Sequence, residues 1–293
     1  MNLLLSVLEQ GLIYAILALG VYITFKILDF PDMSVDSSFP LGAAVTALMI
    51  QAGISPLLTL PVSMLAGAAA GVLTGVIHVK LKVRDLLAGI IVMTALYSVN
   101  LHIAGRANVQ LFSFSTIFKN ELVASLPAAM QPYVPVIILA IIAIAVKLLM
   151  DAYLATRSGF LLRATGDNAT LVATLAKDAG KVKILGLSIA NALVALSGCI
   201  MCQYQRYFDI SMGTGTLVLA VASVIVGTQL LRGFRFLGAT TAVVLGSILY
   251  KGCVALALSL GLSPFDLKLV TAVLLLVIII FGGQGRKKVK RHA

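Results

Sequence analysis

Residues 156–183, TRSGFLLRATGDNATLVATLAKDAGKVK, form a polar interval that decides how the rest of the chain is organised. Apolar runs of spanning length lie on both sides, so this interval connects two membrane spans. We expect a short helix over Asp167–Ala179. Asp167 is its expected N-cap, because a carboxylate there can accept from the free amides of the first turn. Gly180 is its expected C-cap.

One face of this short helix is apolar. Leu171, Val172 and Leu175 fall together at helical spacing. At about 1.5 Å per residue the helix is too short to cross a bilayer. Two interpretations stay open: the helix lies on lipid headgroups or on the ends of the chain's own spans, or it docks onto a soluble partner.

The composition is that of a membrane protein. Of 293 residues, 60% are hydrophobic and only 11% are charged, whereas soluble domains carry about 25% charged residues. We expect one transmembrane domain over residues 1–293, with residues 155–183 as a cytoplasmic loop and 286–293 as a basic cytoplasmic tail. The net charge of +11 gathers in that tail and in short turns. This pattern is typical of cytoplasmic loops and does not indicate nucleic-acid binding.

Nine apolar segments predict an all-α polytopic fold with broken helices. They are Leu3–Leu28, Leu41–Ala52, Pro56–Val79, Leu86–Ala104, Tyr133–Met150, Ile184–Tyr204, Leu217–Leu231, Leu237–Leu258 and Leu267–Gly282. The second is too short to span alone, and the acids and prolines of Asp29–Pro40 are expected to break the helix before it. The basic tail places the C-terminus in the cytoplasm, so nine crossings place the N-terminus outside.

An internal repeat is expected. Asp32-Met33-Ser34-Val35 and Asp209-Ile210-Ser211-Met212 share the pattern acid, apolar, serine, apolar. Each follows a complete span and precedes a short apolar run. Five spans separate the copies, so they insert in opposite orientations, as in transporters whose broken helices mark the pathway. The alternative is that both are ordinary Asp/Ser turns that cap the following helices.

Polar and aromatic side chains in or beside the spans define a candidate substrate path. They are Asp36, Ser38, Phe39, Tyr97, Asn100, Gln203, Met212 and Thr214. Interhelical hydrogen bonding is the alternative role for the polar members of this set. Lys147 and Asp151, four residues apart, are expected to form an ion pair within one helix.

Signs of an enzyme are missing from the sequence. Gly213-x-Gly215 is not followed by the Gly-Lys-Ser/Thr of a phosphate loop. Cys199 and Cys202 have no second Cys or His pair nearby, so no metal site is expected. We expect no catalytic residues and no cofactor in this chain.

Several longer motifs carry a resemblance to a known family. They are ILDFPD (27–32), SVDSSFPLGA (34–43), RATGDN (163–168), ILGL (184–187), NALVALSG (191–198), QYQ (203–205) and ASVIVG (222–227). The chain resembles the permease subunits of bacterial ABC importers of the branched-chain amino acid and ribose type, in particular the tryptophan or aromatic amino acid subgroup. Ser37 and Thr228 depart from the pattern of that subgroup, which has Gly and an acidic residue there.

The resemblance implies a multi-pass permease of the bacterial inner membrane that imports amino acids. It implies a second permease copy, two cytoplasmic ATPase subunits that bind ATP and Mg²⁺, and an extracytoplasmic substrate-binding protein. Arg163, Gly166, Asp167, Leu171, Val172 and Leu175 would couple the permease to the ATPase. An ion-coupled secondary transporter is the alternative, because such carriers also have inverted repeats. A functional charge deep in a span would favour it.

Overall fold

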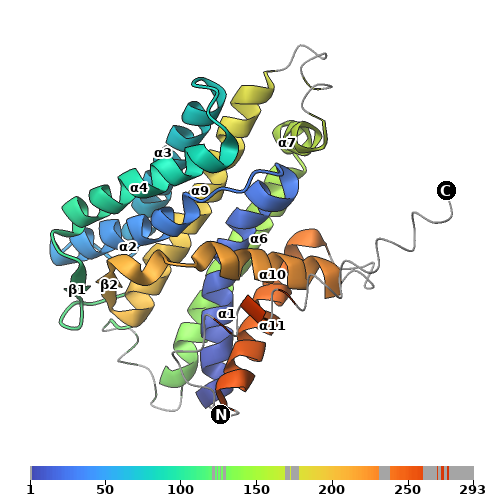
Figure 1. The fold of residues 1–293 in the computed structure, drawn as a ribbon. Coiled ribbons are helices and arrows are strands. Elements are labelled where there is room, and N and C mark those ends of the chain that lie inside the picture. Colours follow the sequence, from blue (N-terminus) through green and yellow to red (C-terminus); the bar gives the residue numbers. More distant parts are fainter. Residues whose placement is uncertain are drawn as a thin grey trace.

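The computed structural model describes residues 2–120, 130–168, 178–230 and 238–259, and the single residues 123, 125, 127, 172, 269, 272, 273 and 276. Its elements are helical apart from one pair of short strands (Figure 1). The long helices are α1 (Asn2–Val21), α2 (Val35–Gln51), α3 (Thr59–Val79), α4 (Asp85–Ala104), α6 (Val134–Leu154), α9 (Ala179–Gln205), α10 (Thr216–Leu230) and α11 (Ala239–Ser259). Shorter elements are the π-helix η1 (Tyr22–Ile27), the 3-10 helices η2 (Gln131–Tyr133) and η3 (Ile210–Gly213), and helix α7 (Arg157–Asp167).

Seven helical segments of the described part are long and apolar enough to cross a membrane. The chain is therefore a polytopic, all-α membrane protein. The first eight predicted segments correspond to the eight long helices. The ninth, Leu267–Gly282, falls almost entirely outside the described residues.

The helix break before α2 is shorter than predicted. We expected no helix before Leu41, yet α2 begins at Val35 and contains Pro40. Proline has no N–H, so it cannot bond the carbonyl of Asp36 four residues earlier. The loss of this hydrogen bond is tolerated because Gly213 packs against the Asp36 carbonyl oxygen and Pro40.

Helix α9 is the centre of the fold. It packs against α1, α2 and α3, and 78% of its most apolar window is buried, more than in any other spanning helix described. Small side chains allow this. Gly67, Gly71 and Gly75 form a ridge on α3, and a Cβ added at Gly71 would lie 2.2 Å from the Leu187 carbonyl oxygen of α9. Small residues of this kind let the backbones of neighbouring membrane helices approach closely.

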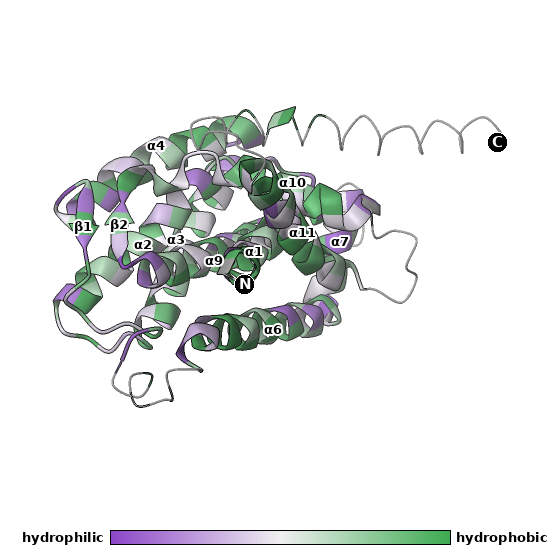
Figure 2. Ribbon diagram, turned by 90° about the horizontal axis from the view of Figure 1, so that it is seen from below, coloured by the Kyte–Doolittle hydropathy of each residue, from purple (hydrophilic) through white to green (hydrophobic). Residues whose placement is uncertain are grey.

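The outer helices keep an apolar face uncovered. In α4, α6 and α11 only 28% of the most apolar window is buried. Exposed side chains on these helices include Ile141, Leu149 and Leu256. Figure 2 shows largely hydrophobic ribbon along α6, α10 and α11. Such faces suit contact with lipid.

A two-stranded sheet joins two loops that lie far apart along the chain. Strand β1 (Asn108–Gln110) pairs antiparallel with β2 (Tyr207–Asp209), with Asn108 opposite Asp209. The connection after α4 is thereby held against the break after α9. Neither strand was predicted, because a three-residue strand carries no detectable periodicity.

Candidate functional site

The first break, between η1 and α2, is organised around the carboxylate of Asp32. This side chain is 1% exposed. Its Oδ1 accepts hydrogen bonds from the Ser34 amide (2.9 Å) and hydroxyl (2.6 Å). Its Oδ2 accepts from Asn191 Nδ2 on α9 at 2.8 Å. These hydrogen bonds satisfy the buried carboxylate of Asp32, and the bond from Asn191 attaches the first break to α9.

The second break, between α9 and α10, contains the same turn. Asp209 Oδ1 accepts from the Ser211 amide at 2.8 Å and from the Ser211 hydroxyl. Asp209 Oδ2 accepts from Asn108 Nδ2 at 3.1 Å. The Ser211 hydroxyl bond holds the pKa of the Asp209 carboxyl below its usual range. The two copies of the predicted repeat therefore share one hydrogen-bond pattern, an Asp bonded to the Ser two residues on and to a distant Asn.

Asp36 links the two breaks directly. From the first turn of α2, its carboxylate accepts from the amides of Gly215 (3.1 Å) and Leu217 (2.8 Å) and from the Thr216 hydroxyl (3.1 Å). It therefore caps the N-terminus of α10, where the helix dipole favours an anion. The sequence did not indicate this, because the partners lie far apart along the chain.

A close backbone contact accompanies that cap. A Cβ added to Gly213 would lie 1.9 Å from the Asp36 carbonyl oxygen and 2.6 Å from Pro40 Cδ. Only glycine fits there, against the carbonyl that Pro40 leaves without its helical partner. The proline of one break and the glycine of the other thus meet in the same place.

Helix α4 forms a further wall of this region. Asn100 Nδ2 donates to the Ser37 carbonyl oxygen at 3.0 Å, and the Ser37 hydroxyl donates to the Met93 carbonyl oxygen at 2.8 Å. Ser38 Oγ and Asn100 Oδ1 are buried and have no hydrogen-bond partner among the described residues. Unpartnered buried polar atoms are rare in folded proteins.

The other predicted path residues divide into two groups. Tyr97 is 50% exposed, Thr214 is exposed and Met212 is partly buried. Phe39 is fully buried and stacks on Tyr14, with ring centroids 6.2 Å apart. Gln203 is also buried, where its Nε2 donates to Thr59 Oγ1 at 2.9 Å. The structure thus places Asp36, Met212 and Thr214 at the two breaks, stacks Phe39 on Tyr14 and hydrogen-bonds Gln203 to Thr59.

Two ionisable groups inside spans were missed. Glu9 on α1 is 8% exposed and accepts from the Tyr204 hydroxyl at 2.7 Å. Lys251 Nζ on α11 lies 4.0 Å from the Tyr14 ring centroid and 3.4 Å from Gln10 Oε1. A single charged residue inside an apolar run was the signal that could have found each of them.

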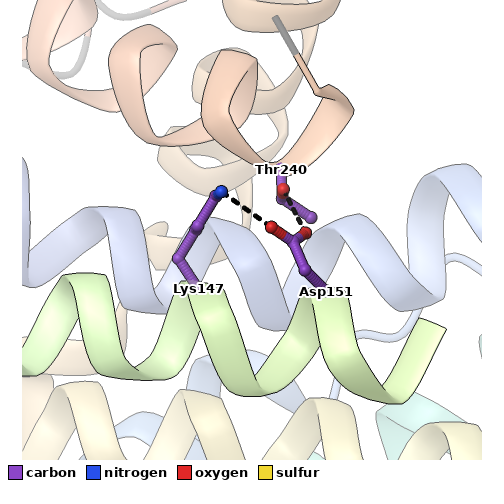
Figure 3. A network of polar contacts seen from close by, with 3 residues as sticks. All are labelled: Lys147, Asp151 and Thr240. Atoms are coloured by element: carbon purple, nitrogen blue, oxygen red, sulfur yellow. Dashed lines mark hydrogen bonds and ion pairs between the residues drawn. The ribbon is translucent and has the colours of Figure 1, made fainter. Parts of the chain in front are cut away.

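The end of α6 is tied to α11 by a small polar cluster (Figure 3). Lys147 Nζ and Asp151 Oδ2 form the predicted ion pair at 2.7 Å. The Thr240 hydroxyl, in the first turn of α11, donates to the other oxygen of the same carboxylate. The predicted ion pair within α6 is confirmed, and the structure adds a hydrogen bond to the same Asp151 from Thr240 of α11.

Helix α7 lies at the opposite end of the molecule from the N-terminus (Figure 1). Thr156 caps it by accepting from the Gly159 amide at 3.2 Å. A Cβ added to Gly166 would overlap the Ile27 carbonyl oxygen of η1, so α7 packs closely on the end of the first span. Phe160 is 59% exposed, and the Arg163 guanidinium lies 5.9 Å from its ring centroid.

Two predicted caps near α7 are wrong. Asp167 is the last residue of α7, so it is not the N-cap of a following helix. Gly180 lies in the first turn of α9, where a Cβ would meet Val79 Cγ1 at 2.4 Å, so it serves close packing and ends no helix.

Asp178 begins α9. It caps the helix by accepting from the Lys181 amide at 3.1 Å, which lowers the pKa of its carboxyl. Val172 is 1% exposed and is therefore buried within this chain. Leu171 and Leu175 lie outside the described residues.

The family whose members are described as the branched-chain amino acid transport system / permease component matches residues 3–281. The chain belongs to this family. The predicted relationship is confirmed. With seven apolar helices of spanning length among the residues that the structure describes, the permease is a multi-pass protein of the bacterial inner membrane.

Relatives of this permease support the assignment over nearly its whole length. The tyrosine transport system permease protein of Clostridioides difficile is 43% identical over 99% of this chain and 95% of its own. The ribose import permease protein RbsC of Escherichia coli K12 is 26% identical over 95% of this chain and 85% of its own. The solved structure of PsaBC from Streptococcus pneumoniae in complex with Fab shares the fold, with a TM-score of 0.52 at 13% identity over 95% of this chain and 90% of that one.

Proposed function

We propose that this permease is the membrane subunit of an ATP-driven importer whose substrate is an aromatic amino acid of the tyrosine type. The observation that carries the proposal is the 43% identity, over 99% of the chain, to a protein named for tyrosine transport. The ribose permeases are more distant, at 26–27% identity. Specificity normally also depends on the separate protein that delivers the substrate.

The proposed topology has nine spans, an extracellular N-terminus and a cytoplasmic C-terminus. The eight long helices supply eight crossings, and Leu267–Gly282 supplies the ninth. The turn containing Lys80, Lys82 and Arg84 and helix α7 then lie in the cytoplasm, in agreement with the bias of basic residues toward that side.

The substrate path is proposed to run beside the two breaks, between this permease and a second copy of itself. Asp36, Ser38, Asn100, Met212 and Thr214 would line it, together with Tyr97. The unpartnered oxygens of Ser38 and Asn100 support this assignment, because irregular backbone and free polar atoms at membrane depth are tolerated where they line a cavity. A substrate-binding protein would deliver the amino acid from outside.

Docking of the ATPase is proposed for α7 and the turn that follows it. The exposed Phe160 and Arg163 of α7 offer an apolar and a charged contact, and Leu171 and Leu175 would add to them. Gly166 and Asp167 would carry motion into η1, on which α7 packs. Val172, being buried, would anchor this segment to the permease. ATP and Mg²⁺ would bind the ATPase and not this chain.

Uptake of labelled tyrosine tests the substrate. Deleting the gene in its source organism should abolish high-affinity uptake, and the wild-type gene should restore it. Excess unlabelled phenylalanine or tryptophan should compete with tyrosine, and ribose should not. Competition by ribose alone would rule out the amino acid assignment.

The energy source separates this proposal from an ion-coupled carrier, which the buried Glu9 of α1 would favour. An ATP-driven importer should lose uptake when cellular ATP is depleted while the ion gradient is maintained. It should also copurify with an ATPase subunit. Uptake that survives ATP depletion and stops with a protonophore would establish the carrier instead.

A double substitution tests the docking surface. Burying a leucine contributes about 1.5–3 kcal/mol, so Leu171→Asp with Leu175→Asp should detach the ATPase or uncouple its hydrolysis from uptake. Leu148→Asp with Leu149→Asp on α6 is the control for a membrane-facing pair, and it should disturb folding without selective loss of the ATPase. Normal uptake by the Leu171/Leu175 variant would refute this docking site.

A further inference from the structure

A pocket of about 390 Å³ lies where α3 ends and where α4 and α9 begin. Its lining includes His78, Lys82, Arg84 and Lys183. The close packing of Gly180 on Val79 brings the start of α9 against the end of α3. Lys82 adopts a φ of 55°, a left-handed conformation unusual for a residue other than glycine. The pocket is thus built by three helix ends and a constrained turn.

One cation of this pocket, Lys183, is held in place by a hydrogen bond to the ring of His78. His78 Nδ1 lies 2.9 Å from the Val83 carbonyl oxygen, which can only accept, so Nδ1 carries the proton. His78 Nε2 is then the acceptor, and Lys183 Nζ donates to it at 3.4 Å. The Lys183 ammonium group is therefore held in position and keeps its positive charge.

No ion pair in the described part of the chain neutralises these cations. Within the described part of the chain, ion pairs join Lys147 to Asp151 and Lys181 to Asp178, and none involves a cation of the pocket. The nearest acid along the chain to Arg84 is Asp85, whose Oδ1 accepts from the Leu86 amide at 2.9 Å. A concave site with unpaired Lys and Arg side chains favours an anion with several oxygens, as phosphate has.

Exposed apolar side chains adjoin the cations. Leu81 is 68% exposed, Leu86 is 45% and Leu87 is 50% exposed in the turn and first residues of α4, and Leu185 on α9 is 44% exposed. The apolar spans α3, α4 and α9 all terminate here, so the pocket lies at the level of the membrane surface. Cations directly beside apolar side chains complement an amphiphile better than a free phosphate ion.

We propose that this pocket binds the phosphodiester headgroup of an anionic phospholipid, such as phosphatidylglycerol, from the cytoplasmic leaflet. Arg84 and Lys183 contact the phosphate oxygens, Lys82 adds a third charge, and the acyl chains lie along the leucines of α4 and α9. The bound lipid joins the ends of α3, α4 and α9. The leaflet follows from the topology proposed above, whereas the lipid chemistry does not depend on it.

Native mass spectrometry of the full-length permease, purified in mild detergent with any subunits that copurify, tests this site. Dioleoyl phosphatidylglycerol and dioleoyl phosphatidylcholine are titrated separately, and the molecules retained per permease are counted. The pocket variant is Arg84→Gln with Lys183→Gln, in which glutamine can still donate to His78. The matched control is Lys80→Gln with Lys181→Gln, which removes the same charge from the same turns outside the pocket lining.

The wild type and the control should retain one more phosphatidylglycerol than phosphatidylcholine. The pocket variant should bind that lipid about thirtyfold more weakly, since each cation near an anionic membrane surface contributes about 1 kcal/mol and 1.4 kcal/mol is tenfold. Equal elution volumes in size-exclusion chromatography show that all three proteins fold.

Three results would overturn the proposal. The first is equal retention of both lipids by the wild type. The second is displacement of the bound lipid by millimolar inorganic phosphate, which would assign the site to a free phosphate ion. The third is a pocket variant that retains the lipid and loses a copurifying ATPase subunit, which would assign these cations to a protein contact.

Discussion

At the scale of single residues, hydrogen bonds to Asp side chains hold the two helix breaks. Asp32 and Asp209 each bond a serine two residues on and a distant asparagine, but the first pair is buried and the second is exposed. The same hydrogen bonds therefore contribute more to stability at Asp32 than at Asp209. A buried carboxylate that lacks a partner costs far more free energy than one that water can hydrate.

The two asparagines provide a matched comparison. Asn191→Ala should lower the free energy of unfolding by about 1–3 kcal/mol, since it leaves part of the buried Asp32 carboxylate unpaired. Asn108→Ala removes the exposed counterpart and should change it by less than about 0.5 kcal/mol. Denaturation of both variants in mixed micelles measures the difference. Equal losses would show that burial of Asp32 is not what gives the first break its stability.

Asp36 is the residue that connects one break to the other. Asp36→Ala removes the acceptor for the Gly215 and Leu217 amides, so the purified permease should lose about 0.5–2 kcal/mol of stability. Asp36→Asn keeps one acceptor oxygen and should fall between this variant and the wild type. Thermal unfolding followed by tyrosine fluorescence gives the order. If the asparagine variant were as unstable as the alanine variant, the charge and not the cap would be responsible.

At the scale of helices, the closest packing in the fold is made by residues without side chains. Gly71→Ala pushes a methyl group into the Leu187 carbonyl oxygen, so α3 and α9 must separate. Overpacking of this kind destabilises by about 1–3 kcal/mol.

Gly252→Ala on α11 is the control for this substitution, because its Cβ would meet only Val7 Cγ1 at 3.9 Å. It should be neutral or stabilising, since alanine has the higher helix propensity. The yield of monodisperse protein and the unfolding midpoint measure both variants. Equal behaviour of the two would contradict the role assigned to the glycine ridge.

Helices could be predicted well from this sequence, and their ends could not. Long apolar runs gave the eight long helices because membrane insertion imposes both length and hydrophobicity. Gly180 was misassigned as a cap because glycine serves turns and close contacts equally, and only the neighbouring Val79 distinguishes them. The cap of α10 by Asp36 was also beyond prediction, since no local pattern relates residues so distant along the chain.

At the scale of the whole molecule, the structure represents one state of a protein proposed to alternate between several. In this state Ser38 is fully buried and Thr214 is exposed. Ser38 reaches solvent only if the helices packed against α2 move. The two positions therefore report different parts of a transport cycle.

Single cysteines test that inference. In a background with Cys199, Cys202 and Cys253 replaced, Thr214→Cys should react with a small polar thiol reagent in the resting protein, and Ser38→Cys should not. Trapping the assembled transporter with a non-hydrolysable nucleotide should change the reactivity of at least one of them. Identical reactivity in every state, with uptake unaffected by the label, would remove both segments from the pathway.

The glycine ridge of α3 also has a consequence for biogenesis. Helices α1, α2 and α3 leave the ribosome well before α9, the helix on which all three pack. In the nascent chain, Gly67, Gly71 and Gly75 therefore face acyl chains, with a row of helix backbone uncovered. The first three helices cannot complete a core until α9 inserts. A chain truncated before α9 is thus an incomplete bundle with its central groove open, which membrane quality-control proteases would recognise.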